Sequence, residues 1–380
     1  MSDHSLSPPG GIEWLRGDMH NHCERFDLLD EHFGGVDKRL DFLAFTNHAQ
    51  KPIFFHQHEM IARGRELLPG IPVFFGMEWN APEGRHAGVV FPPSSDEADH
   101  AYSFSRAHDR HVDGSNPDVD ASMERLSGKS EEERPVLFFN HPAPDDWSAP
   151  VIERYLRADG GGVACGIEAV HGHQALAKTL ERWDLATYPG CAPGGLADSV
   201  YERGRPFSLL ANSDFHVHKQ ERDYDFPMGI FNHSLVGVPV GDRSPHAILA
   251  ALRAGRTCAS QGFWMKLDEL SVGAGSEAKV GIGGTWQGTG AGAVLRIRLD
   301  SEEEVGSVTL IGRLATGDSS SVLVSFGPQP AGPLQLEFAV PPGACGHLRL
   351  RVVSASVERP APSPPGPKGF FTSAILLENA

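Results

Sequence analysis

The hexapeptide GDMHNH, at positions 17–22, places two histidines two residues apart, shortly after an aspartate. In a β-strand, residues i and i+2 point to the same side, so His20 and His22 can reach one metal ion, and Asp18 shares their face. A similar pattern, NSDFHVH, returns at positions 212–218. Two clusters so far apart in the chain require a fold that brings them together.

Short apolar runs between positions 17 and 265 indicate what that fold is. Examples are LDFLAFTNH, IPVFFGMEW, PVLFFNHP and FSLLANSDFH, and short apolar runs of this kind are typical of fully buried strands. Each run ends in polar or ionisable residues. Helix patterns lie between them, and in SPHAILAALRAGR we expect Ser244 as the N-cap, Pro245 at the first helical position and Gly255 at the C-terminal cap. Strands that alternate with helices favour a parallel α/β architecture, and a barrel-like sheet gathers many strand ends into one site.

The ends of these predicted strands carry side chains that bind transition metals. Besides His20 and His22, the candidate ligands are Asp27, His48, Glu78, His141, His171, His173, Asp214 and His216. Imidazole and carboxylate bind Zn, Mn or Fe, and a donor set without thiolates does not select among these metals. One catalytic zinc ion needs only three or four ligands, so this many donors favour two or three divalent ions that share a bridging carboxylate.

The order of these motifs resembles the PHP (polymerase and histidinol phosphatase) superfamily of metal-dependent hydrolases. DMHNHCERFD resembles that family's D-x-H-x-H with a following loop aspartate, and DFLAFTNHA resembles its strand that ends in Asp-His. GMEW, FNHP and SDFH resemble its later glutamate, histidine and Asp-x-His motifs. The resemblance implies a distorted (β/α)7 barrel. YERGRPFSLLANSDFH, ALRAGRTCASQG and FFTSAILLEN resemble the carbaryl-hydrolase (CehA/McbA-like) subgroup.

The resemblance also implies a ligand set for each ion. The first ion takes His20, His22, Glu78 and Asp214; the second takes Glu78 as a bridge, His141, and either His171 or His173; the third takes Asp27, His48 and His216. Asn47 stands where the family usually has an aspartate, which lowers the negative charge expected around the third ion. We expect Glu78 and Asp214 to be catalytic, together with His86 as a substrate contact or a proton donor to the leaving group.

Such a centre predicts a hydrolase in which the ions lower the pKa of a water molecule and the resulting hydroxide attacks the substrate. The superfamily resemblance favours a phosphoesterase acting on a small phosphomonoester or phosphodiester. The alternative is hydrolysis of a carboxylic ester, carbamate or amide, which the subgroup resemblance favours. Basic residues are also scarce near the motifs, Arg25 and Arg85 being the nearest in sequence. A second alternative is a non-catalytic binding module with a vestigial metal site.

Composition restricts the expected partners. The formal net charge of -16 argues against a nucleic-acid surface, because phosphate backbones are bound by clustered Lys and Arg. We therefore expect a small-molecule substrate and no nucleic acid. The sequence has neither the pattern of a signal peptide nor an apolar stretch of membrane length, so we expect no membrane contact and a cytoplasmic location. The sequence leaves the oligomeric state open.

The chain changes character near position 265. Alternating runs such as AVLRIRLD, SVTLIGRL and HLRLRVVSA are separated by Gly, Pro and Ser turns, which indicates antiparallel strands of a β-sandwich-like domain. We expect a PHP-like hydrolase domain over residues 1–264 and a small C-terminal β-sandwich-like domain over 265–380. Only His347 among the 19 histidines lies beyond His246, so the second domain is expected to hold no catalytic residue.

Overall fold

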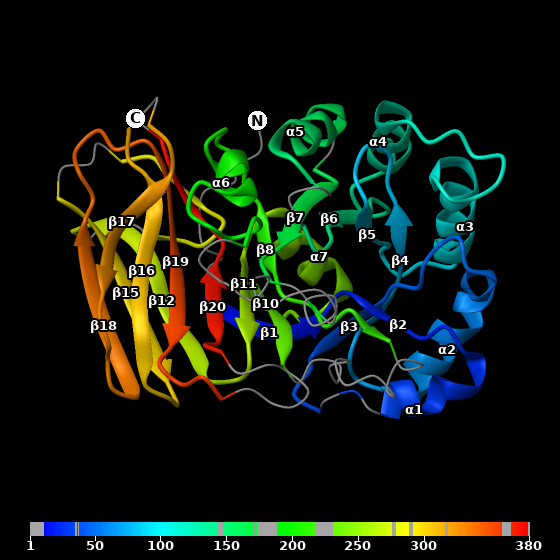
Figure 1. Ribbon diagram of the computed structural model, residues 1–380, viewed down its shortest axis with the longest axis horizontal. Helices are drawn as coiled ribbons and strands as arrows, with labels where there is room; N and C mark the ends of the chain where they lie inside the picture. The colour runs from blue at the N-terminus through cyan, green and yellow to red at the C-terminus, as the bar shows by residue number, and fades with distance from the viewer. Residues whose placement is uncertain are drawn as a thin grey trace.

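The protein is described by a computed structural model in which β-strands outnumber helices (Figure 1). The described residues are 11–34, 36, 38–142, 147–160, 162–170, 172, 188–216, 231–275, 279–288, 292–315, 318–358 and 366–378. The helices are η1 (Phe26–Leu28), α1 (Leu29–Gly34), η2 (Pro52–His56), α2 (Gln57–Leu67), α3 (Glu97–His108), α4 (Val119–Ser127), α5 (Ala149–Ala158), α6 (Leu196–Tyr201) and α7 (Pro245–Arg253). Among the described residues, no helix is both long and apolar enough to cross a membrane.

The strands fall into two groups. The earlier strands belong to the α/β pattern of the sequence, and the later strands belong to the alternating pattern. The earlier strands are β1 (Ile12–Asp18), β2 (Asn21–His22), β3 (Phe42–Phe45), β4 (Val73–Asn80), β5 (His86–Val90), β6 (Val136–Phe139), β7 (Ala164–Glu168), β8 (Ser208–Leu210), β9 (Phe215–His216), β10 (Asn232–Pro239) and β11 (Thr257–Gln261). The later strands are β12 (Met265–Ala274), β13 (Val280–Gly281), β14 (Thr285–Trp286), β15 (Ala293–Ser301), β16 (Val305–Arg313), β17 (Ser321–Phe326), β18 (Gly332–Ala339), β19 (Gly346–Ser354), β20 (Gly369–Thr372) and β21 (Ile375–Leu377).

A large mixed sheet positions the polar strand ends. Its earlier strands run in the order β11-β10-β1-β3-β4-β5-β6-β7-β8. β1, β3 and β4 are parallel neighbours, as are β6, β7 and β8, whereas β5 is antiparallel to both β4 and β6. Every residue of β4, VFFGMEWN, is buried, as expected of a strand covered on both faces. The expected α/β class is therefore confirmed.

The closed (β/α)7 barrel stays a prediction. The antiparallel pairs on both sides of β5 and between β1 and β10 depart from a purely parallel barrel. Among the described residues no ladder joins β8 to β10; side chains approach the β8 backbone instead. Leu209 N donates to Ser373 Oγ (2.8 Å), and Ala211 N, just past β8, donates to Ser234 Oγ (3.0 Å).

Two local sequence features explain how elements of this sheet begin and pack. Helix α7 starts as expected, because the Ser244 side chain accepts a hydrogen bond from Ala247 N and Pro245 is the first helical residue. Gly17, in the opening motif, lies across from Phe42 on β3. A Cβ atom at position 17 would lie 2.2 Å from the Phe42 ring, so only glycine lets this aromatic ring cover the strand before the histidines.

The later strands form a sandwich at the opposite end of the molecule from α1–α4 (Figure 1). One sheet has the order β13-β12-β15-β18, and it packs against β16 and β19 of the large sheet through a core that includes Val272, Leu295, Ile297, Leu310 and Leu350. The large sheet is continuous between the two parts, because β20 pairs with both β11 and β19. The domain boundary at 264/265 stays a prediction.

A buried ion pair fastens α6 to the sandwich. The Arg349 guanidinium of β19 donates to both carboxylate oxygens of Asp198 (2.6 and 2.8 Å), and His347 Nε2 lies 3.2 Å from the same carboxylate. Arg349 Nη2 also donates to the carbonyl of Cys191 (2.9 Å). All three ionisable side chains are fully buried, so each depends on the others for solvation.

We predict that Asp198→Asn lowers the free energy of unfolding by about 3–5 kcal/mol, because Arg349 would stay buried without its anionic partner. Burial by itself raises the pKa of Asp198, but Arg349 and His347 lower it well below its usual value. Stability from this carboxylate is therefore complete above about pH 4 and is lost as the pH falls further. Urea denaturation of both proteins at several pH values measures the difference.

Glu153→Gln is the matched control. Glu153 pairs with Arg203 at the surface (2.7 Å), where solvent screens the charges, so its loss should cost less than about 1 kcal/mol. Equal effects of the two substitutions would show that burial of the Asp198 pair has no special weight.

Candidate metal centre

The two histidine motifs are joined by a short parallel ladder. β2 pairs with β9, so that Asn21 lies opposite Phe215 and His22 opposite His216. Asp214 N donates to His20 O (2.8 Å). Asp18 faces this junction too, since its carboxylate accepts hydrogen bonds from the hydroxyl and the N–H of Ser213. The aspartate of the opening motif therefore holds the second motif in place.

Three further strands deliver ligands to the same place. His48 follows β3 and forms an isolated bridge with Glu78 of β4. His86 begins β5, and His141 follows β6. Because β3, β4, β5 and β6 are consecutive neighbours in the sheet, these side chains converge on one region.

Glu78 lies at the centre of the cluster and is buried. Its Oε1 atom lies 3.1 Å from His20 Nε2, 3.0 Å from His86 Nδ1 and 3.0 Å from His141 Nε2. Its Oε2 atom lies 3.0 Å from His48 Nδ1 and 3.4 Å from His22 Nε2. Each carboxylate oxygen thus faces its own set of imidazole nitrogens.

Asp214 supplies a second buried carboxylate. Its Oδ1 atom lies 3.3 Å from His22 Nε2 and 3.4 Å from His20 Nε2. Asp214 (φ 51°) and His141 (φ 26°) are two of the three described non-glycine residues with positive φ. Such backbone conformations are unfavourable for residues with side chains and concentrate at functional sites.

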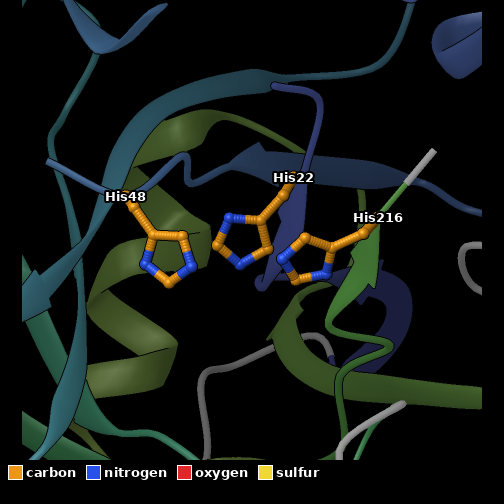
Figure 2. Close-up of side chains that lie close together, drawn as sticks. All are labelled: His22, His48 and His216. Carbon is orange, nitrogen blue, oxygen red and sulfur yellow. The ribbon is translucent and has the colours of Figure 1, made fainter. Parts of the chain in front are cut away.

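A third group consists only of imidazoles. Figure 2 shows His22 between His48 and His216, with ring centroids 4.7 Å and 4.2 Å from that of His22. One nitrogen from each ring lies within 4.8 Å of the others, close enough for a shared ion. Within the described part of the chain, four groups of donors could hold an ion, and they overlap: His22 with His48 and His216; His20 with His141 and Asp214; His20 with His22 and Glu78; and His48 with Glu78 and His86.

The chemistry of these donors fits divalent metal ions. Both ring nitrogens of His22 are buried without a hydrogen-bond partner among the described residues, a costly state unless something else binds them. Burial, with help from His216 and His48, lowers the pKa of His22 well below its usual value. His22 is therefore a neutral imidazole with a lone pair to donate.

The Glu78 carboxylate at the centre is held ionised. Burial raises the pKa of Glu78, but His86, His20 and His48 outweigh it and lower the pKa well below its usual value. For His20, burial lowers the pKa, whereas Asp214, Glu78 and Glu168 raise it well above the usual value. Glu78 thus offers negative oxygens to a multinuclear centre, and His20 would give up a proton to bind a metal ion there.

Some predicted ligands are not among the groups that the described residues form. Asp27 is largely exposed and forms an ion pair with Arg25, so its assignment to the third ion stays a prediction. His171 and His173 lie outside the described residues. The Asn47 side chain accepts a hydrogen bond from Cys23 N (2.9 Å) and donates to Cys23 O (2.8 Å), so this residue braces the chain after His22.

Sequence reasoning missed Glu168, the last residue of β7. Its carboxylate is buried and contacts His20 Nδ1 (3.0 Å), His141 N and the Asn212 side chain. Burial raises the pKa of Glu168, but His20, His141 and Asn212 together lower it below its usual value, so the group is ionised. A carboxylate that accepts a hydrogen bond from the second nitrogen of a metal-binding histidine orients that ring. The signal was a glutamate at the end of an apolar run, GIEAV, the same position that Glu78 has in GMEW.

Comparison with known proteins gives little direct identification. No protein-family model and no curated protein matches the chain. Among solved structures, the lesion-specific endonuclease PfuEndoQ from Pyrococcus furiosus is similar, with 12% sequence identity and a TM-score of 0.38. The similarity covers 64% of this chain and 56% of the endonuclease, little more than half of that protein.

The similar protein is an endonuclease. This finding contradicts our expectation that the protein has no nucleic-acid partner. The exclusion rested on the net charge of -16, and net charge describes the whole surface. Metal ions held in one buried cluster are themselves local positive charges, so an acidic chain can still bind phosphate at such a place.

We predict that Glu168→Gln weakens metal binding by about 10–100-fold, because Nδ1 of His20 would lose a charged acceptor while the shape of the side chain is kept. Competition with a chelator of known affinity measures the change. His56→Ala, in an exposed H-x-H pair, is the control and should bind metal as the wild type does. Wild-type affinity of Glu168→Gln would mean that Glu168 does not orient His20.

Proposed function

We propose that the protein is a metal-dependent hydrolase and that its substrates are phosphoesters. The observation that carries the proposal is Glu78, whose two buried oxygens face separate sets of imidazoles. A carboxylate in this arrangement suits a bridge between two ions. The order of the motifs, which resembles that of the PHP superfamily, supports the same reading.

The proposed centre holds its first ion with His20, His22 and Asp214, and its second with His141, with Glu78 shared between them. His48 and His216 are placed for a third. Bound ions supply two things in such a site: they lower the pKa of a water molecule, and they neutralise charge that develops on the substrate. Neighbouring side chains hold the donors in fixed positions. Glu168 contacts Nδ1 of His20, and Asn140 donates a hydrogen bond to Glu78.

Phosphoester substrates suit a centre with several cations. Phosphoryl transfer spreads negative charge over several oxygens, and two ions can stabilise both the attacking and the leaving oxygen. The hydrolysis of a carboxylic ester, carbamate or amide polarises a single carbonyl oxygen and needs less positive charge. A cluster with this many donors therefore supports the phosphoester proposal.

The carboxylic ester, carbamate or amide alternative keeps one observation in its favour. Arg25, a basic residue close to the opening motif, is paired with Asp27 at the surface. In this arrangement Arg25 has an acidic partner rather than a place in the cluster, and a neutral substrate would not need a phosphate clamp.

We predict that Glu78→Gln removes two ions per chain, because the amide lacks the charge that both would share. Elemental analysis of protein purified without chelator should give two or three ions for the wild type, and His56→Ala should match it. Prolonged chelation of the wild type should abolish hydrolysis, and Mn, Zn or Fe should restore it. Retention of all the metal by Glu78→Gln would mean that the bridge is elsewhere.

The reaction class can be decided by steady-state assays with matched aryl substrates. We predict that kcat/KM for an aryl phosphate or a bis-aryl phosphodiester exceeds that for the aryl carboxylic ester by at least tenfold. A short DNA duplex and its single strand should be assayed in parallel, to determine whether a nucleic-acid phosphodiester is also cleaved. A kcat/KM at least tenfold higher for the carboxylic ester would replace the proposal by its alternative.

A further inference from the structure

The segment 188–195 packs directly against the peptide of Glu168. A Cβ atom on Gly190 would lie 2.2 Å from the carbonyl oxygen of Glu168 and 3.3 Å from Cγ of Pro142. Glu168 ends β7, and Pro142 comes directly after His141. Glycine at position 190 therefore lets this segment touch the ends of two strands that carry residues of the cluster.

Backbone hydrogen bonds make the segment a compact turn. The N–H groups of Cys191 and Ala192 both donate to Tyr188 O, at 3.1 and 2.8 Å. Leu196 N, at the start of α6, donates to Pro189 O (2.8 Å). Tyr188 and Cys191 are buried. Because the turn is closed by its own hydrogen bonds, a displacement of one of its carbonyl groups also shifts the glycine that touches β7.

Arg349 of β19 holds this turn from the side of the sandwich. Its Nη2 atom donates to the carbonyls of Cys191 (2.9 Å) and Ala192 (3.1 Å). Asp198 completes the link, because its Oδ2 atom accepts hydrogen bonds from Arg349 Nη2 (2.8 Å) and from Gly194 N (2.8 Å). Hydrogen bonds that involve an ionised group are stronger than neutral ones, so the turn is firmly attached to β19.

We propose that Arg349 is a positioning residue for the metal centre, and that it acts on Glu168 through the turn at 188–195. The Glu168 carboxylate contacts His20 Nδ1 (3.0 Å) and accepts a hydrogen bond from His141 N. A shift of the Glu168 peptide would therefore change the orientation of one proposed ligand and the backbone of another. The inference rests on the metal centre of the proposed function. It gives the sandwich a part in that centre without a catalytic residue.

A purely structural Arg349 would change the free energy of unfolding but not the metal affinity of the folded protein. The test therefore measures Zn²⁺ affinity, by competition with a chelator, and the visible spectrum of the Co²⁺-loaded protein. Circular dichroism checks the fold.

Two substitutions change the link at its two ends. Arg349→Lys keeps a cation beside Asp198 but loses the planar group of donors that also reaches the carbonyls of the turn. Gly190→Ala leaves the ion pair intact and forces a methyl group against Glu168 O. We expect each variant to bind Zn²⁺ about tenfold more weakly than the wild type, with a changed Co²⁺ spectrum.

Two controls separate positioning from a loss of stability. Leu295→Ala creates a cavity in the core of the sandwich and should lower the free energy of unfolding, but metal affinity and the Co²⁺ spectrum should match the wild type. Gly160→Ala should leave both stability and metal affinity unchanged, since a Cβ atom there would meet nothing within 4 Å.

A double-mutant cycle tests the route. If Arg349 acts through Glu168, Arg349→Lys should weaken Zn²⁺ binding much less in a Glu168→Gln background than in the wild type. If Arg349→Lys does not fold, Asp198→Asn, which loosens the same ion pair, takes its place in the cycle. Additive losses would overturn the inference, as would wild-type affinity and an unaltered spectrum in the folded variants.

The proposed function fails differently. In that case the metal-loaded wild type would hydrolyse none of the phosphoesters, whereas the weaker Zn²⁺ binding of Arg349→Lys and Gly190→Ala would still hold. A wild type that binds no metal would refute both.

Discussion

The structure depends on the burial of one carboxylate, Glu78, among five histidine rings. An ionised carboxylate removed from water costs several kcal/mol unless positive charge or hydrogen bonds replace the lost solvation. Backbone pairing holds the surrounding donors in place. His48 forms a bridge with Glu78. His86 begins β5, which pairs with β4 and with β6, the strand that His141 follows. A cluster of this kind is stable when cations complete it, which links the fold to the chemistry that we propose.

The sequence predicted that most of these side chains would lie together, because residues at the ends of neighbouring strands converge on one edge of a sheet. The strand-end rule brought His20, His48, Glu78, His141 and Asp214 to one region, and the structure places them within contact of one another. Asp27, which the family resemblance assigns to the third ion, lies in η1 and pairs with Arg25 at the surface, so this assignment stays a prediction. Glu168 was missed because a single acidic residue at a strand end does not reveal, from sequence alone, which residues it contacts.

The parts of the fold that the sequence did not predict involve pairing between distant segments. Apolar runs indicate strands but not their direction, so the antiparallel pairing of β5, which carries His86, with β4 and β6 was not predicted. The alternating pattern beyond position 265 did predict strands with one buried face, because period-two burial is a local property. That pattern did not predict the fully buried Arg349, which meets Asp198 from an element more than a hundred residues earlier.

The insertion of β20 between β11 and β19 affects how the chain can fold during synthesis. The edge of β11 has no partner strand until residues 369–372 have left the ribosome. The hydrogen bond from Leu209 N to the hydroxyl of Ser373 is delayed in the same way. Contacts of such long sequence separation form slowly and leave strand edges exposed in the meantime. The histidine cluster, whose residues all precede position 217, therefore leaves the ribosome before the strand that completes its sheet. A chain shortened by its last dozen residues would leave the edge of β11 unpaired and prone to association.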